Sequence, residues 1–216
     1  MTTKTILCYG DSNLRGFIPG SFNKNTGLSA RFGRDKRWTG ILQTLLGSDY
    51  YVIEEGINGR TTTRDEIYPG RPHRNGLGAL LMCLESHYPI DLIIFMLGTN
   101  DVKLQFNHSS EEIVEGMRRL VRVAKSSNIG TEKILIIAPQ PIVKIADLHP
   151  QFDDIAIEKS KALAPLYQRL AEEESCGYLD AAQFLTSSRL DGVHIEEQDM
   201  PLLAAAVAEK VKQIGG

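Results

Sequence analysis

Four short polar segments of the chain contain side chains that could act together on a carbonyl group. They are Gly10-Asp11-Ser12-Asn13, Gly56-Ile57-Asn58-Gly59, Gly98-Thr99-Asn100-Asp101 and Asp191-Gly192-Val193-His194. A serine hydroxyl becomes a nucleophile when a neighbouring base takes its proton and a third group orients that base. Ser12, His194 and Asp191 have the side chains that these three functions need. We therefore predict acyl chemistry with Ser12 as nucleophile, His194 as general base and Asp191 as the acid that orients the base.

The spacing of Asp191 and His194 favours a direct contact between their side chains. Asp191 precedes His194 by three residues, so one tight turn brings the carboxylate to the ring, and Gly192 helps such a turn to form. In this arrangement Asp191 holds one imidazole tautomer and stabilises the imidazolium, and does not itself take the proton.

Cleavage of an ester also needs hydrogen-bond donors for the oxyanion that develops in the transition state. The backbone N–H groups of Ser12 and Gly59 and the side-chain amide of Asn100 are the candidates for this oxyanion hole. Gly59 has no side chain to obstruct an approaching carbonyl. Loss of one such donor typically lowers kcat by about 100- to 1000-fold.

Taken singly, each of these segments has a simpler structural interpretation. A Gly-Asp-Ser sequence is usually a turn because Asp and Ser cap helices well, and an isolated Asp-x-x-His is more often a surface turn. The Gly-Thr-Asn-Asp sequence could equally be ordinary loop chemistry. The prediction depends on the combination, since four unrelated turns at the ends of the expected strands would be an improbable coincidence.

The remaining histidines fit a catalytic base less well. His73 and His108 lie in polar loops, and His87 lies near the end of an expected helix, where a cationic ring is favoured by the dipole. His149, with Asp147, Asp153 and Asp154, could suggest a metal site, but this group has no recognisable metal-ligand spacing, so a solvated loop is the better interpretation. We expect neither a metal nor a cofactor.

Apolar runs alternate along the chain with segments of helical periodicity. Strands are expected over 4–9, 51–55, 92–97, 133–138 and from 178, and helices over 38–46, 78–88, 109–124, 155–174 and 198–214. Five alternations of strand and helix predict an α/β fold of three layers, with a parallel sheet between helices. We predict the flavodoxin-like strand order 2-1-3-4-5. That order would place the turns containing Ser12, Gly59 and Asn100 side by side at the carboxyl ends of the strands, where open parallel sheets bind ligands.

Two connections, 16–36 and 140–153, are longer than such a fold requires. Long loops in a compact domain are usually lids, binding loops or subunit contacts.

The bulk composition is that of an ordinary globular protein. A chain of 216 residues suits one domain over residues 1–216, and a net charge of -3 gives no reason to expect nucleic acid or an anionic membrane as partner. The N-terminal segment lacks the apolar run of a secretory signal, and three cysteines at unrelated spacings do not suggest disulfides or zinc. The expected location is the cytoplasm.

The four polar segments resemble the sequence blocks of SGNH (GDSL-type) hydrolases, and they follow one another in the order of that family. The resemblance implies a serine hydrolase with the roles predicted above for Ser12, Gly59, Asn100, Asp191 and His194. The lipase pattern G-x-S-x-G is absent because Leu14 occupies its last position, which disfavours a nucleophile-elbow α/β-hydrolase.

Within that family, the chain more closely resembles a subgroup of bacterial arylesterases and acyltransferases. The shared segments are Arg37-Trp38-Thr39-Gly40, Val52-Ile53-Glu54-Glu55-Gly56, Arg60-Thr61-Thr62 and Met96-Leu97-Gly98-Thr99-Asn100-Asp101. This resemblance implies a homo-oligomer, often an octamer, whose inserted loops narrow the entrance to the site. One departure is that Leu14-Arg15-Gly16-Phe17 replaces an aromatic-rich segment of the type Thr-Trp-Gly-Trp.

Three hypotheses for the function remain open at this point. The first is hydrolysis of small esters (short-acyl, aryl or acetyl) through an acyl-enzyme, with carbohydrate or lipid acyl esters as variants. The second is acyl transfer to an alcohol at the same site, if the loops exclude water. The third is a flavodoxin-like binding module without catalysis. No glycine-rich phosphate loop supports the third, and Asp11 would repel a phosphate near the first turn.

Overall fold

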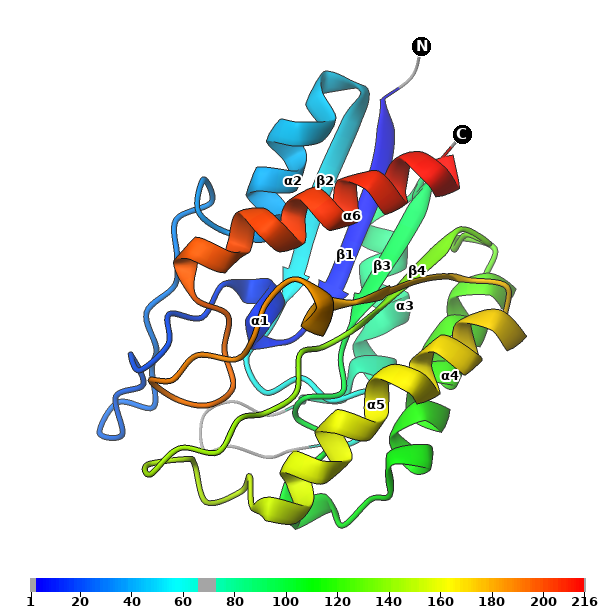
Figure 1. Cartoon of the computed structure of the whole chain (residues 1–216). Helices are drawn as coiled ribbons and strands as arrows, with labels where there is room; N and C mark the ends of the chain where they lie inside the picture. The colour runs from blue at the N-terminus through cyan, green and yellow to red at the C-terminus, as the bar shows by residue number, and fades with distance from the viewer. Residues whose placement is uncertain (1–2, 66–72, 216) are drawn as a thin grey trace.

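The computed structural model describes residues 3–65 and 73–215, and its centre is a five-stranded parallel sheet in the order β2-β1-β3-β4-β5 (Figure 1). The strands are β1 (Lys4–Gly10), β2 (Tyr50–Gly56), β3 (Leu92–Met96), β4 (Ile134–Ala138) and β5 (Gly177–Asp180). The predicted fold class and strand order are confirmed. Each strand lies within one residue of its expected bounds. For β5 only the start was predicted, and the strand runs from Gly177 to Asp180.

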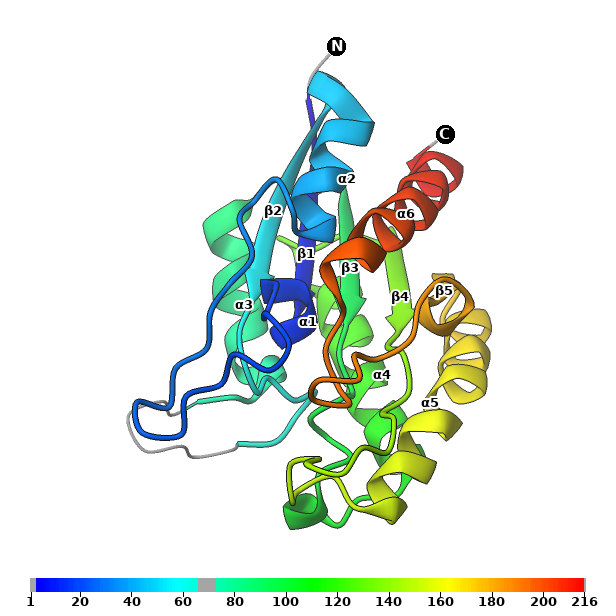
Figure 2. The ribbon, with the colours of Figure 1, turned by 60° about the vertical axis from the view of Figure 1, so that its left-hand side comes forward.

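Helices cover both faces of the sheet. They are α1 (Ser12–Arg15), α2 (Trp38–Leu46), α3 (Gly76–His87), α4 (Ser110–Ser126), α5 (Asp154–Glu173) and α6 (Met200–Gly215). Helices α2 and α6 pack on one face, and α3, α4 and α5 pack on the other (Figures 1 and 2). Short 3-10 turns lie at Gly47–Asp49, Leu104–Phe106, Ala181–Gln183 and Glu197–Asp199.

Successive residues of the inner strands enter different cores because side chains alternate across a sheet. In β1, Leu7 and Tyr9 lie in the core under α3, α4 and α5, whereas Ile6 and Cys8 lie in the core under α2 and α6. Each of these four side chains is at most 1% exposed. Burial on both sides explains why this strand is apolar without alternation, as expected of a central parallel strand.

Helix caps explain where several helices begin. The expected capping box is present, with Ser109 accepting from the Glu112 backbone N–H and the Glu112 carboxylate accepting from Ser109 N–H. Helix α3 begins two residues earlier than expected because Asn75 caps the N–H groups of Leu77 and Gly78. Helix α6 begins later than predicted because a 3-10 turn precedes it.

The long connection after α1 is partly ordered by backbone pairing. Antiparallel bridges join Phe17 to Arg31 and Asn23 to Leu28, so the segment folds back on itself before α2. The other long connection, 139–153, runs from β4 to α5.

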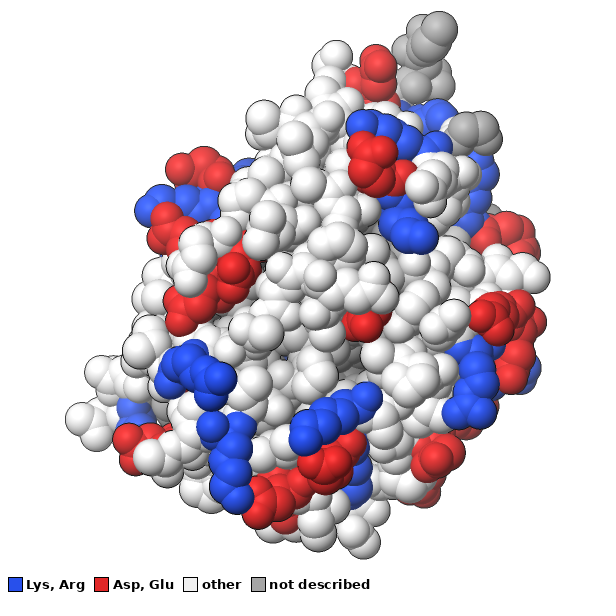
Figure 3. Space-filling view, viewed as in Figure 1, with Lys and Arg blue, Asp and Glu red and all other residues white. Residues whose placement is uncertain are grey.

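On the face shown in Figure 3, Lys and Arg side chains lie among Asp and Glu side chains. Across the described residues, no helix combines the length and the apolar character needed to cross a bilayer.

Candidate active site

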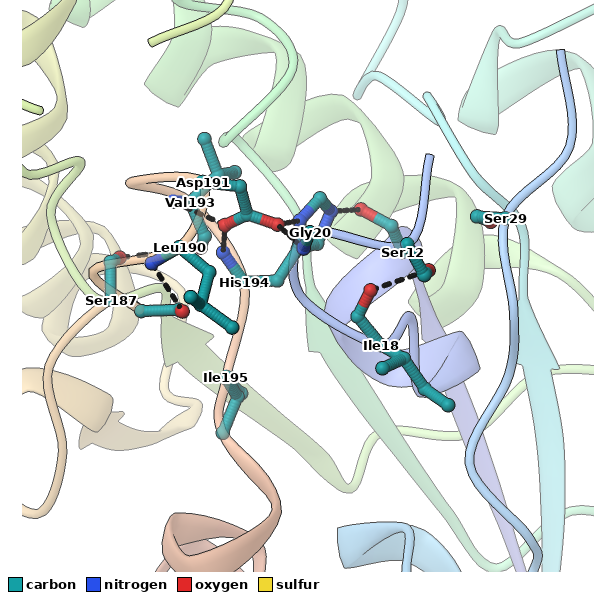
Figure 4. A network of polar contacts seen from close by, with 12 residues as sticks. Ser12, Ile18, Gly20, Ser29, Ser187, Leu190, Asp191, Val193, His194 and Ile195 are labelled. Atoms are coloured by element: carbon teal, nitrogen blue, oxygen red, sulfur yellow. Dashed lines mark hydrogen bonds and ion pairs between the residues drawn. The ribbon is translucent and has the colours of Figure 1, made fainter. Parts of the chain in front are cut away.

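Ser12, His194 and Asp191 form a continuous hydrogen-bonded line (Figure 4). The distance from Ser12 Oγ to His194 Nε2 is 2.9 Å, and the distance from His194 Nδ1 to Asp191 Oδ2 is 2.8 Å. Ser12 opens α1 immediately after β1, whereas the other two residues lie between β5 and α6. The structure therefore brings together the three side chains that were predicted to act as nucleophile, base and orienting acid.

The turn from Asp191 to His194 is built by backbone hydrogen bonds to one carboxylate oxygen. Asp191 Oδ1 accepts from the N–H groups of Val193 and His194, each at 3.0 Å. Gly192 between them has a φ of 76°, and a Cβ at this position would lie 2.6 Å from the Val143 carbonyl oxygen. Only glycine fits this turn without strain, as the sequence indicated.

The side chain after the serine connects the two halves of the site. Asn13 Oδ1 accepts from Ile195 N–H at 3.2 Å, and Asn13 is 1% exposed. This bond joins α1 to the residue that follows His194. The preceding residue, Asp11, caps α1 by accepting from Asn13 N–H at 2.9 Å. Both bonds fix the position of Ser12 relative to the imidazole.

The electrostatics of Asp191 suit a residue that stays ionised. Burial by itself would raise the pKa of Asp191, but the hydrogen bond and charge of the His194 ring, with two backbone N–H groups, lower it to about 2. The carboxylate is therefore negative at neutral pH. Because this pKa is below that of the unfolded chain, its ionisation stabilises the fold above pH 4, and the stabilisation is lost as pH falls through about 2.

The three turns that carry Ser12, Gly59 and Asn100 leave the sheet at the same level. Gly10 at the end of β1 is in register with Gly56 of β2 and with Met96 of β3. Gly59 has a φ of 78°, and within the described residues no group accepts a hydrogen bond from its N–H. The predicted neighbourhood of these turns at one sheet edge follows from this register.

The Asn100 amide nitrogen is oriented by two acceptors. Nδ2 donates to the Arg60 carbonyl oxygen at 3.1 Å and to Asp11 Oδ2 at 3.4 Å. The second distance is longer than an ordinary N–H···O hydrogen bond, which measures about 2.7–3.2 Å, so the contact of Nδ2 with Asp11 is the weaker one.

Several residues of the segments named above support the site in ways that the sequence did not predict. Asp101 accepts from Thr62 N–H at 2.9 Å and from Thr62 Oγ1 at 2.6 Å, which ties the third turn to the second. The Arg60 guanidinium lies 4.0 Å from the centre of the Tyr9 ring and donates to the Gly10 carbonyl oxygen at 3.1 Å. The sequence did not indicate these contacts, because the partners lie 39 residues apart for Asp101 and Thr62 and 50 residues apart for Arg60 and Gly10.

Two buried carboxyl groups lie behind the site. Burial is the largest influence on Asp11 and on Asp101, and it raises the pKa of each to about 6. Hydrogen bonds from Asn13 to Asp11, and from Thr62 to Asp101, offset part of that rise. Both groups therefore bind a proton more tightly in the folded chain than in the unfolded chain.

This shift predicts a pH dependence of stability. Because the folded pKa of Asp101 is raised, the free energy of unfolding should fall as pH rises from about 4 to about 6, as the buried group is forced to ionise. In Asp101→Asn the amide cannot ionise, and it keeps an oxygen to accept from Thr62. Between pH 4 and pH 7 the free energy of unfolding of the variant should rise by on the order of 3 kcal/mol relative to that of wild type, as measured by urea unfolding.

Asp147→Asn is the matched control, because Asp147 is exposed. Its difference from wild type should be the same at pH 4 and pH 7. A constant difference for Asp101→Asn as well would show that the buried carboxyl does not titrate in this range.

The other histidines lie in different surroundings. His87 Nε2 is 2.8 Å from Glu55 Oε1, and His149 packs edge-on against Phe152. In the part of the chain that the structure describes, no three His, Cys, Asp or Glu side chains are grouped to hold a metal ion.

Comparison with known proteins gives a consistent result. Residues 8–199 match the model of the GDSL-like lipase/acylhydrolase family. The structure of the carbohydrate acetylesterase Est24 from Sinorhizobium meliloti is 35% identical, with a TM-score of 0.89 over 98% of this chain and 99% of that chain. The native M. smegmatis aryl esterase is 36% identical, with a TM-score of 0.89 over 98% and 100% of the two chains.

A lipase/acylhydrolase from Enterococcus faecalis is 20% identical, with a TM-score of 0.66 over 98% of this chain and 96% of that chain, and shows the fold alone. Among curated protein sequences none matches the chain.

Proposed function

We propose, since the chain belongs to the GDSL-like lipase/acylhydrolase family, that it is a serine esterase that hydrolyses small acyl esters through an acyl-enzyme. The observation that carries the proposal is the hydrogen-bonded line from Ser12 Oγ through His194 to Asp191. A hydroxyl, an imidazole and an ionised carboxylate in this order are what nucleophilic catalysis by serine requires.

In the first half of the reaction, Ser12 Oγ attacks the ester carbonyl carbon while His194 Nε2 takes the hydroxyl proton. Asp191 accepts from His194 Nδ1–H, so the ring presents a bare Nε2 to the serine and gains a compensating charge when it becomes imidazolium. The imidazolium then gives its proton to the departing alkoxide or phenoxide, which leaves Ser12 acylated. Water activated by the same Nε2 attacks the acyl-enzyme and releases the acid, with Ser12 restored.

The negative oxygen of each tetrahedral intermediate requires donors that are already in place. We assign this function to Ser12 N–H, Gly59 N–H and Asn100 Nδ2. The first lies at the start of α1, the second follows β2, and the third is held by Arg60 and Asp11. Fixed donors of this kind stabilise the transition state without having to reorganise during the reaction.

A short acyl group is the best-supported substrate. The similar solved structures include a carbohydrate acetylesterase and an aryl esterase, at 35% and 36% identity. Acetyl esters of aryl alcohols or sugars would present the same small carbonyl group to Ser12.

The test combines turnover with chemical labelling. Nitrophenyl esters from acetate to octanoate should be hydrolysed fastest at the short end, with an initial burst of nitrophenol where deacylation limits turnover. A fluorophosphonate probe should block this activity with one-to-one stoichiometry and should be found on the peptide that contains Ser12. Urea-unfolded protein is the control, because labelling needs the folded imidazole. Failure to label Ser12 in folded protein would refute the proposal.

A further inference from the structure

The segment after α1 contacts the His194–Asp191 pair at two separate points. The Phe17 ring lies over the His194 ring with a centroid separation of 3.7 Å and an interplanar angle of 7°. Three residues later, Gly20 N–H donates to Asp191 Oδ2 at 3.2 Å, and this is the oxygen that also faces His194 Nδ1. Figure 4 shows Gly20 beside the Asp191 carboxylate.

This segment is held in place by its own backbone hydrogen bonds. Phe17 N–H donates to the Ser12 carbonyl oxygen at 3.0 Å, Phe17 pairs with Arg31, and Ile18 N–H donates to the Ala30 carbonyl oxygen at 3.2 Å. Phe17 is 8% exposed. The Phe17 ring is therefore buried against the imidazole, and its backbone is held in place on both sides.

The geometry of the ring pair favours a positively charged imidazole. Two neutral aromatic rings prefer offset or edge-on contacts with centroids about 4.5–7 Å apart, because their electron-rich faces repel each other. At 3.7 Å and 7° the rings lie nearly face to face. A cationic ring over a phenyl face is instead attracted by its quadrupole, most strongly where water is excluded. In the proposed reaction, the imidazolium forms when His194 takes the proton of Ser12.

The hydrogen bond from Gly20 acts on the same charge distribution. Asp191 accepts four hydrogen bonds. Oδ2 accepts from His194 Nδ1–H and Gly20 N–H, and Oδ1 accepts from the backbone N–H groups of Val193 and His194. These fix the carboxylate plane and keep it ionised opposite the imidazole. Gly20 has a φ of 71°, a conformation that favours glycine.

We propose that Phe17, together with the Gly20 N–H, positions His194 and Asp191 and stabilises the imidazolium that forms during acyl transfer. Phe17 fixes the ring plane so that Nε2 points at Ser12, and its face favours the charged ring over the neutral one. The proposal rests on the function proposed above for His194. Phe17 is a positioning residue, because its ring contacts the base and is not assigned any contact with the ester.

The test compares Phe17→Leu with Phe17→Trp. Leucine keeps an apolar cover over the imidazole but has no aromatic face, whereas tryptophan restores one. Phe17→Leu should lower kcat for nitrophenyl acetate about 10-fold with KM within about twofold of wild type. Phe17→Trp should recover most of kcat. Phe22→Leu is the matched control, because the Phe22 side chain lies in the same loop and is 49% exposed; it should behave as wild type.

A proton NMR measurement separates this proposal from the proposed function. The His194 Nδ1–H that faces Asp191 should give a downfield resonance in wild type and in Phe17→Trp, and it should be shifted or broadened in Phe17→Leu. A raised KM with unchanged kcat in Phe17→Leu would mean that Phe17 lines the acyl pocket, and an unchanged resonance with unchanged kcat would remove any positioning role. If wild type hydrolyses no ester, the proposed function fails, but the resonance still reports whether Phe17 positions the ring.

Discussion

Ser12→Ala should lower kcat for nitrophenyl acetate by roughly 10⁴- to 10⁶-fold, because in the proposed mechanism Ser12 Oγ is the atom that forms the acyl-enzyme. The residual rate should still exceed that in water, since Gly59 and Asn100 remain to bind an oxyanion. Folding should be unaffected. The Ser12 hydroxyl has its hydrogen bond with His194 Nε2, and alanine suits the first turn of α1. Steady-state kinetics and thermal unfolding of the same preparation measure both effects.

Ser126→Ala is the control for this substitution, because Ser126 is an exposed residue in the last turn of α4. That variant should keep the wild-type kcat and its labelling by fluorophosphonate. If Ser12→Ala retained even one tenth of the wild-type kcat with an unchanged unfolding temperature, Ser12 would not be the nucleophile.

Asp191→Asn should lower kcat by about 10⁴-fold while the protein stays folded. The amide oxygen can still accept from the Val193 and His194 N–H groups, so the turn is preserved. The amide NH₂ would then take the place of Oδ2 and face His194 Nδ1. Two donors cannot face each other, so the ring adopts the tautomer with its proton on Nε2, which cannot accept the proton of Ser12.

The measurement is kcat and the rate of fluorophosphonate labelling across the pH range, with circular dichroism as the test of folding. Asp153→Asn is a suitable control, because Asp153 caps α5 away from the site and asparagine is also a good cap. A loss smaller than about tenfold in Asp191→Asn would show that the carboxylate does not set the tautomer.

The sheet could be predicted from the sequence because its inner strands are apolar at nearly every position. The segment Leu92–Met96 is buried at every position, and a run of that kind has few alternatives to a central parallel strand. The helix Ser12–Arg15 was not predicted, because four residues cannot show helical periodicity and the Gly-Asp-Ser sequence alone indicates a turn.

The site, too, could be predicted only in part. Ser12 and His194 could be named because few residue types can act as nucleophile and base, and the strand order predicted that their turns would meet. Phe17 could not be assigned a role, because a single aromatic residue in a loop carries no sign of the ring on which it stacks. Asp101 resembled a turn residue, and only the tertiary fold shows that it holds Thr62.

The hydrogen bond between Ser12 and His194 spans 182 residues of the sequence. A chain that ends after α5 contains Ser12 but not His194, so the proposed mechanism predicts no esterase activity for it. Contacts between residues so far apart form late in folding, because the entropy lost on closing the long loop must first be offset by contacts within the sheet. Onset of esterase activity during refolding from urea would therefore report when the segment between β5 and α6 docks beside α1.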